Sequence, residues 1–210
     1  MDAAQETRRN PYGMDEDCRN CAGLCDQRER VVHGYGDVGA DFVFVAESPS
    51  AASEAAGVPL VGDDAGERFQ HILGSVGLNH SLPSSTEPEL ANAYVTLLSR
   101  CRHPDREATA DERTRCEPYL NADIRMINPE VLVPVGQRAL TELGKEYTTT
   151  PADSLAVTEL HGDTVRGRGF ELVPMIHPRE QSDAQTDAWI DFFLSFKDTD
   201  YRQTKGRRSR

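Results

Sequence analysis

Short apolar runs alternate with helical patterns through most of this chain, and this alternation constrains the fold more than any other feature. Each run has the length of a buried strand, and the segment after it carries apolar residues at helical spacing. Strands are predicted at 42–46, 94–98, 131–135 and 171–176, and helices at 65–76, 111–127, 137–143 and 184–196. Strands that alternate with helices pair in parallel and carry helices on both faces of the sheet. The sequence therefore predicts an α/β fold, a three-layer α/β/α sandwich with a central, mainly parallel four-stranded sheet.

Two helix ends can be predicted from single residues. Thr109 or Asp111 suits the N-cap of the helix at 111–127, because a short side chain can accept a hydrogen bond from a free backbone N–H. Gly144 suits the end of the helix at 137–143, since glycine adopts the left-handed conformation that is common at helix C-termini.

One domain accounts for most of the 210 residues, because 38% hydrophobic content is enough for a sizeable core. We expect this domain at 18–196, with an N-terminal arm at 1–17 and a basic, disordered tail at 197–210. The longest apolar runs are a quarter of the roughly 20 residues that a membrane-spanning helix needs, so no membrane partner is expected. The first residues lack the apolar stretch of a secretory signal, which predicts a cytoplasmic protein.

The charge balance is strongly acidic, with 35 acidic against 23 basic residues and a formal net charge of -12. Such a balance opposes long-range attraction to phosphate and taken alone argues against a nucleic-acid partner. The basic residues are arginines except for Lys145, Lys197 and Lys205. Acid-rich, lysine-poor surfaces suit a cytoplasm at very high salt, where charges are screened within a few ångströms. We therefore hypothesise a halophilic protein, in which net charge indicates little about partners.

The five cysteines are spaced as a local group and two distant residues. In a cytoplasmic chain they are expected as metal ligands or ordinary buried thiols. A redox pair is disfavoured because no strand precedes the CxxC segment. The better interpretation is a four-thiolate site that combines the local pair with the two distant cysteines, and either zinc or a [4Fe-4S] cluster would accept it. The cysteines are Cys18, Cys21, Cys25, Cys101 and Cys116.

Candidate catalytic residues follow from the predicted sheet. In open parallel sheets, ligands bind beyond the carboxyl ends of the strands. Glu47, the segment 97–100, Gly136 and His177 occupy those ends. A carboxylate and an imidazole that face one crevice form a possible catalytic pair, and structural roles for Glu47 and His177 are about as probable from position alone.

The order of the motifs adds a resemblance to a known family. Together they resemble the iron–sulfur branch, family 4, of the uracil-DNA glycosylase superfamily. The resemblance spans 18–193. The matching segments are Cys18-Arg-Asn-Cys21, Val45-Ala46-Glu47-Ser48-Pro49-Ser50, Gly57-Val58-Pro59-Leu60-Val61-Gly62, the run from Thr96 through Cys101 to Pro104, Cys116-Glu-Pro-Tyr-Leu120, the run from Asn128 to Gly136, and Ile176-His177-Pro178.

The resemblance implies a cofactor, a substrate and residue roles. It implies a structural [4Fe-4S] cluster on Cys18, Cys21, Cys101 and Cys116, with Cys25 left over nearby. It further implies DNA that contains uracil or a damaged base as the partner, base flipping, and hydrolysis of the N-glycosidic bond by a monomer. His177 would stabilise negative charge on the departing base, and Glu47 would orient water and offset positive charge on the sugar. The implied substrate-binding residues are Ser48, Pro49, Leu60, Leu97 and Ser99.

Two departures from the family pattern fall in the implied base pocket. Leu97 stands where the family has an asparagine that reads the uracil edge, and Leu60 stands where it has a stacking phenylalanine. Leucine can neither donate nor accept a hydrogen bond, so altered or weak uracil specificity is expected. The alternative is a non-catalytic iron–sulfur DNA-binding or regulatory paralogue that has lost uracil recognition. Another nucleotide-directed hydrolase and a zinc-stabilised structural protein also stay open.

Overall fold

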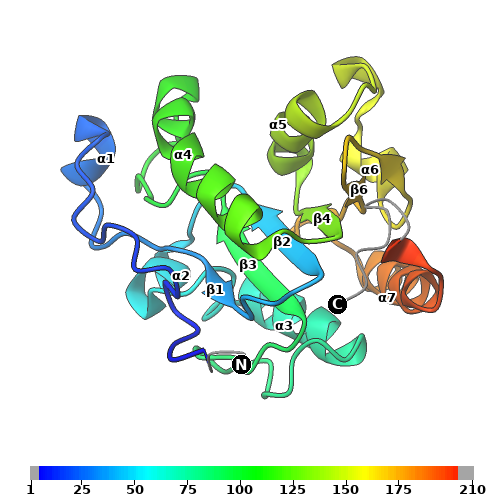
Figure 1. Ribbon diagram of the computed structural model, residues 1–210. Coiled ribbons are helices and arrows are strands. Elements are labelled where there is room, and N and C mark those ends of the chain that lie inside the picture. The colour runs from blue at the N-terminus through cyan, green and yellow to red at the C-terminus, as the bar shows by residue number, and fades with distance from the viewer. Residues whose placement is uncertain (1–4, 203–210) are drawn as a thin grey trace.

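The structure, a computed structural model, describes residues 5–202 and has three layers around one sheet (Figure 1). The strands run β1-β3-β2-β4-β6-β5 across the sheet. Their bounds are β1 Tyr35–Gly36, β2 Phe42–Ala46, β3 Ala93–Leu97, β4 Val131–Pro134, β5 Val165–Arg166 and β6 Glu171–Leu172. The helices are α1 Ala22–Cys25, α2 Ala51–Ala56, α3 Asp64–Ser75, α4 Ala110–Ile127, α5 Gln137–Tyr147, the short η1 Ala152–Ser154, α6 Val157–Leu160 and α7 Asp183–Lys197.

The α/β sandwich is confirmed, but the sheet is mixed and has six strands rather than four. The four central strands, β3, β2, β4 and β6, are parallel as predicted. The edge strands β1 and β5 pair antiparallel to their neighbours. Each edge strand has only two residues, which is too short for a periodic pattern in the sequence.

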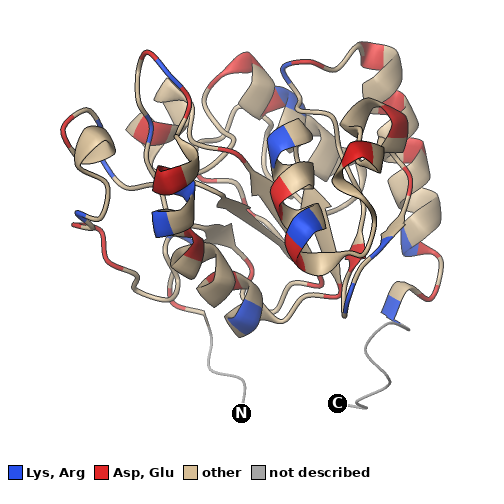
Figure 2. Ribbon diagram, turned by 90° about the horizontal axis from the view of Figure 1, so that it is seen from above, with Lys and Arg blue, Asp and Glu red and all other residues tan. Residues whose placement is uncertain are grey.

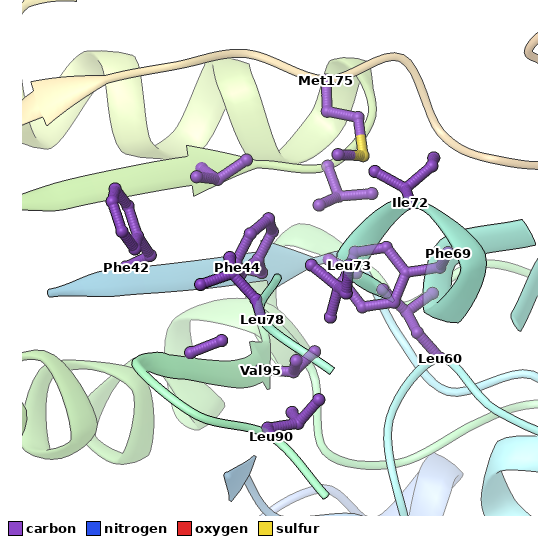
Figure 3. Close-up of a cluster of buried hydrophobic side chains, with 14 of the residues drawn as sticks. Phe42, Phe44, Leu60, Phe69, Ile72, Leu73, Leu78, Leu90, Val95 and Met175 are labelled. Carbon is purple, nitrogen blue, oxygen red and sulfur yellow. The ribbon is translucent and has the colours of Figure 1, made fainter. Parts of the chain in front are cut away.

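The central strands are buried on both faces. In β2, Phe42 and Phe44 point into a core that α3 and α7 cover, whereas Val43 and Val45 point into a second core under α4 and α5. Figure 3 shows the first of these cores, with Phe44 beside Phe69 and Leu73 of α3 and Phe42 farther along β2. A strand buried on both sides reads as a continuous apolar run, which is why the pattern at 42–46 predicted β2 correctly.

The helix ends agree with the sequence at one position and differ at another. Thr109 caps α4, and its side chain and that of Glu112 form a reciprocal capping box. The predicted end of a helix at Gly144 is wrong, because α5 continues to Tyr147. Gly144 instead makes room for Leu155, since a Cβ atom there would lie 2.3 Å from the leucine Cδ1. The glycine therefore serves close packing rather than helix termination.

The last predicted strand, 171–176, is regular only at Glu171–Leu172. Beyond β6 the chain still follows β4, with Val173 N–H donating to Leu132 O at 3.0 Å and Met175 N–H donating to Pro134 O at 2.9 Å. Pro174 has no N–H and interrupts the regular ladder. This extension carries the chain to His177 at the same edge of the sheet.

The ends of the described chain contact the domain. Asn10 N–H donates to Gly34 O at 3.0 Å, which attaches the N-terminal arm beside β1. In the region expected as a tail, the Tyr201 hydroxyl donates to Asp41 Oδ2 at 3.1 Å and Arg202 pairs with the same carboxylate. The rest of the expected tail, 203–210, lies outside the described residues.

The outer surface is mixed in charge. Figure 2 shows acidic residues on most of the outer helices and loops, with arginine and lysine between them. Within the described part of the chain, no helix is both long and apolar enough to cross a membrane.

Candidate active site and cysteine cluster

Glu47 and His177 lie at the carboxyl edge of the parallel strands. Glu47 follows β2 directly, and His177 follows the extension of β6. The two strands, β2 and β6, are not neighbours, because β4 lies between them. Gly136, at the end of β4, adopts a φ of +92°, and a Cβ atom there would lie 3.4 Å from the Cβ of His177. A glycine at this position therefore gives His177 room at the edge of the sheet.

The Glu47 carboxylate is partly buried and forms an ion pair with Arg138. Its side chain is 27% exposed, and Oε1 accepts a hydrogen bond from Arg138 Nε at 3.2 Å. Arg138 also contacts Glu107, with Nη2 donating to Oε2 at 2.9 Å. Burial and the nearby Glu107 raise the pKa of Glu47, while Arg138 opposes this rise. The result is a carboxylate that takes up a proton more readily than an exposed glutamate.

His177 is arranged as a neutral hydrogen-bond donor. Burial and the cation of Arg179 lower its pKa, so the imidazole is uncharged at neutral pH. Its Nδ1 accepts a hydrogen bond from Arg179 N–H at 3.2 Å. In a neutral ring whose Nδ1 accepts, the proton resides on Nε2. His177 can therefore donate from Nε2 to an anion at this edge of the sheet.

Leu60 and Leu97 lie in the same hydrophobic core rather than in the wall of an open crevice. Leu97 has no exposed surface and Leu60 is 7% exposed. Figure 3 shows Leu60 pointing toward Phe69, and its backbone oxygen accepts from Gln70 Nε2 at 3.1 Å. Both side chains pack with α3 and therefore offer little surface to a flipped base.

The other residues implied as substrate-binding occupy two loops. Ser48 and Pro49 lie between β2 and α2, next to Ser50, which caps α2 by accepting from Ser53 N–H at 3.2 Å. Ser99 N–H donates to Glu47 O at 2.8 Å, but its buried hydroxyl donates to Cys101 O at 3.1 Å. Ser99 thus contacts Glu47 through its backbone and Cys101, in the loop after β3, through its side chain.

Four of the five cysteines line one narrow cavity beside α4. The N-terminal segment supplies Cys18 and Cys21, the loop after β3 supplies Cys101, and α4 supplies Cys116. Figure 1 shows α1 next to α4, and the Cys21 thiol contacts Glu112 O at 3.7 Å. Segments that are about 80 residues apart in the chain therefore meet at this cavity. Cys25, at the end of α1, has its thiol 3.5 Å from Cys18 O.

Two arginines face the cysteine cavity. Arg28 Nη1 lies 3.2 Å from Cys101 Sγ and 3.3 Å from Cys25 Sγ, and Nη2 contacts Cys18 O. Arg100 is completely buried, and its Nε and Nη1 have no hydrogen-bond partner among the described residues. Buried donors without a partner are rare in folded proteins, so these two nitrogens require a partner such as an ion or a water molecule.

Four cysteines supply the kind of donor that an iron–sulfur cluster needs, but in the described structure their thiols are not gathered closely enough to hold one. Burial raises the pKa of Cys101 to about 11, while Arg28 opposes this rise, and burial raises that of Cys21 to about 11. Without a metal these thiols therefore stay protonated near neutral pH, whereas metal binding requires thiolates. The guanidinium group of Arg28 would offset part of the charge of four thiolates, whereas that of Arg100 already pairs with Asp123. Among the described residues, no three histidine, cysteine or acidic side chains are gathered closely enough to hold a metal ion.

Tertiary structure adds residues that the sequence did not indicate. Arg138 comes two residues after Gly136, a position at the strand end that could have drawn attention to it. Arg28 comes three residues after Cys25, the spacing of neighbours on one helical face. No sequence pattern indicates Glu107 or Asp123, because their partners Arg138 and Arg100 lie on other elements.

Comparisons with known proteins match this sequence to one superfamily. Residues 33–198 match the Uracil DNA glycosylase superfamily. The chain is 32% identical over 166 residues to the type-4 uracil-DNA glycosylase of Archaeoglobus fulgidus, covering 77% of this chain and 76% of that protein. It is 28% identical over 153 residues to the type-4 enzyme of Thermotoga maritima, covering 72% and 71%. It is also 28% identical over 193 residues to the type-5 enzyme of Mycobacterium tuberculosis, covering 79% and 70%. The resemblance of the motifs is thereby confirmed, and the chain belongs to the uracil-DNA glycosylase superfamily, in its type-4 branch.

Proposed function

We propose that this chain acts on DNA and excises uracil or another damaged base by hydrolysing its N-glycosidic bond, with Glu47 and His177 as the catalytic residues. The observation that carries the proposal is the position of both residues at the carboxyl edge of one parallel sheet. Membership of a superfamily whose matched relatives are named uracil-DNA glycosylases supports DNA as the substrate.

The chemistry of the bond assigns a role to each residue. When the glycosidic bond breaks, the base leaves with the electron pair and the sugar becomes positively charged. His177, neutral and protonated on Nε2, donates a hydrogen bond to the base oxygen on which negative charge grows. Glu47 offsets the positive charge on the sugar and orients the water whose oxygen bonds to the anomeric carbon. The proton released by that water passes to the Glu47 carboxylate and then to solvent.

We further propose that Cys18, Cys21, Cys101 and Cys116 hold a [4Fe-4S] cluster. The cluster would supply no step of the hydrolysis and would tie the N-terminal segment to the loop after β3 and to α4. Arg28 and Arg100 support this assignment, since both line the same cavity. Arg28 also directs Nη1 toward Cys101 Sγ. Zinc is the competing occupant, and metal analysis distinguishes the two.

Uracil recognition is proposed to be weak. Leu60 and Leu97 lack the aromatic face and the amide that would stack on a pyrimidine and pair with its edge. Their burial also leaves little surface for a base. This packing favours a second candidate function, a non-catalytic iron–sulfur paralogue that binds DNA without excising a base.

The decisive experiment is excision from oligonucleotides that contain a single deoxyuridine. Single-stranded, mismatched and uracil–adenine substrates should be compared at molar and at low salt, because the acid-rich composition predicts a halophilic protein. We expect slow excision that is greatest on single-stranded and mismatched DNA, where flipping costs less. Glu47→Gln and His177→Leu should each slow it by about a hundredfold or more and leave a residual rate that single-turnover assays can measure. If DNA binds and no base leaves any substrate, the non-catalytic candidate replaces the first.

A further inference from the structure

Arg138 lies between two carboxylates at the candidate active site. It is the second residue of α5, and its guanidinium contacts Glu47 through Nε and Glu107 through Nη2. The distances are 3.2 Å to Glu47 Oε1 and 2.9 Å to Glu107 Oε2. One arginine therefore joins a residue after β2 to a residue of the loop that follows Cys101.

Stability alone does not account for this arrangement. Arg138 is 39% exposed and Glu107 is 70% exposed, and ion pairs of such exposure contribute little to folding. Glu47 is the less exposed partner, and Arg138 contacts only one of its two oxygens, Oε1. The contact defines the orientation of the carboxylate and leaves Oε2 unengaged by this guanidinium.

Glu107 is itself well placed to hold the arginine. Its neighbour Arg106 makes two hydrogen bonds to Glu112, at 2.7 and 2.8 Å. Arg113 donates to Ala108 O, and Thr109 begins α4 with a capping box. The loop that carries Glu107 is therefore anchored to α4 on both sides of this residue.

We propose that Arg138 is a positioning residue for the glycosylase reaction: braced by Glu107, it fixes the Glu47 carboxylate through Oε1 and leaves Oε2 to orient the attacking water. The inference rests on the proposed function and deepens it. Arg138 touches neither base nor sugar in this scheme and acts through Glu47.

The charges around Glu47 predict how the reaction depends on pH. The groups that face it are Glu107 on the loop before α4, Arg113 on α4 and Arg138 on α5. Removing the cation of Arg138 raises the pKa of Glu47, so the acidic limb of the rate profile moves to higher pH. Removing the charge of Glu107 lowers that pKa, so the limb moves to lower pH. A general loss of structure would not shift the two profiles in opposite directions.

The test is single-turnover excision of uracil from single-stranded DNA between pH 5 and pH 9. Arg138→Gln should slow excision about tenfold on the acidic limb, the effect of one pKa unit, and Arg138→Lys should restore part of the rate. Glu107→Gln should move the limb the other way. Arg8→Gln is the matched control, because Arg8 is 41% exposed and pairs with Glu89 away from Glu47.

A double variant separates positioning from other effects. In a Glu47→Gln background, Arg138→Gln should cause no further loss, because the carboxylate that it orients is gone. An equal loss in both backgrounds, or a profile for Arg138→Gln that coincides with wild type, overturns the inference and leaves the proposed function intact. A wild-type protein that removes no uracil overturns the proposed function and, with it, this role of Arg138.

Discussion

Arg100 and Asp123 form an ion pair whose side chains are 1% and 0% exposed, and this pair joins the cysteine loop to α4. Asp123 also accepts hydrogen bonds from Tyr94 at 3.1 Å and from Thr96 at 2.6 Å, both on β3. The backbone N–H of Arg100 donates to Cys116 Sγ at 3.3 Å. The network therefore helps to hold Cys101 and Cys116 in relation to each other.

Asp123→Asn should lower the free energy of unfolding by about 3 kcal/mol, because it leaves a buried guanidinium without its counter-charge. Chemical denaturation at fixed salt measures the change. Asp111→Asn is the control, since Asp111 pairs with Arg115 on the exposed surface of the same helix and should cost less than about 0.5 kcal/mol. Equal losses in the two variants would contradict the importance of the buried pair.

Protein purified without oxygen should be brown and contain about four irons per chain. Cys101→Ser should lose the iron and the visible absorption, because it removes one of the four thiols that line the cavity. Cys25→Ser should retain both, since Cys25 contacts Cys18 O and Arg28 beside that cavity. Metal analysis and absorption spectra provide the measurement, and one zinc per colourless chain would contradict the cluster.

Introducing the two pocket residues of the family should improve uracil excision at a cost in stability. Leu97→Asn buries an amide and removes apolar contacts in the core, so it should lower the free energy of unfolding by about 3 kcal/mol. Combined with Leu60→Phe, it should nevertheless raise the rate of excision from duplex DNA. Leu90→Asn, in the same core, should destabilise comparably without that gain. No gain in the double variant would favour the non-catalytic candidate.

Glu47→Gln should stabilise the fold at neutral pH. The folded-state pKa of Glu47 is raised, chiefly by burial, so the unfolded chain loses this proton more readily than the folded one. Ionisation therefore costs stability as pH rises through the folded pKa, and the neutral amide avoids that cost. Thermal unfolding should show a higher midpoint for the variant at pH 7 and no difference below the ordinary pKa of 4.5. A variant that is less stable at pH 7 would show that the contact with Arg138 outweighs burial.

Much of the fold could be predicted because local patterns report burial directly. The run at 42–46 is apolar at every position since both faces of β2 are covered, and the parallel order of the central strands then places Glu47 and His177 at one edge. The edge strands β1 and β5 could not be predicted, because two residues are too few to show an alternating hydrophobic pattern. The role of Gly144 was predicted wrongly, because the sequence does not distinguish a glycine that permits close packing from one that ends a helix.

The α/β class, the grouping of four cysteines as a candidate ligand set and the residues at the strand ends could all be predicted, because each depends on spacing along the chain. The contact of Arg138 with a glutamate 91 residues away and the burial of Arg100 against Asp123 on another element arise from tertiary packing. Leu60 and Leu97 are likewise assigned to the core by packing. Such ion pairs and buried contacts join segments that are far apart in the sequence, so they form only when the strands and helices have packed together.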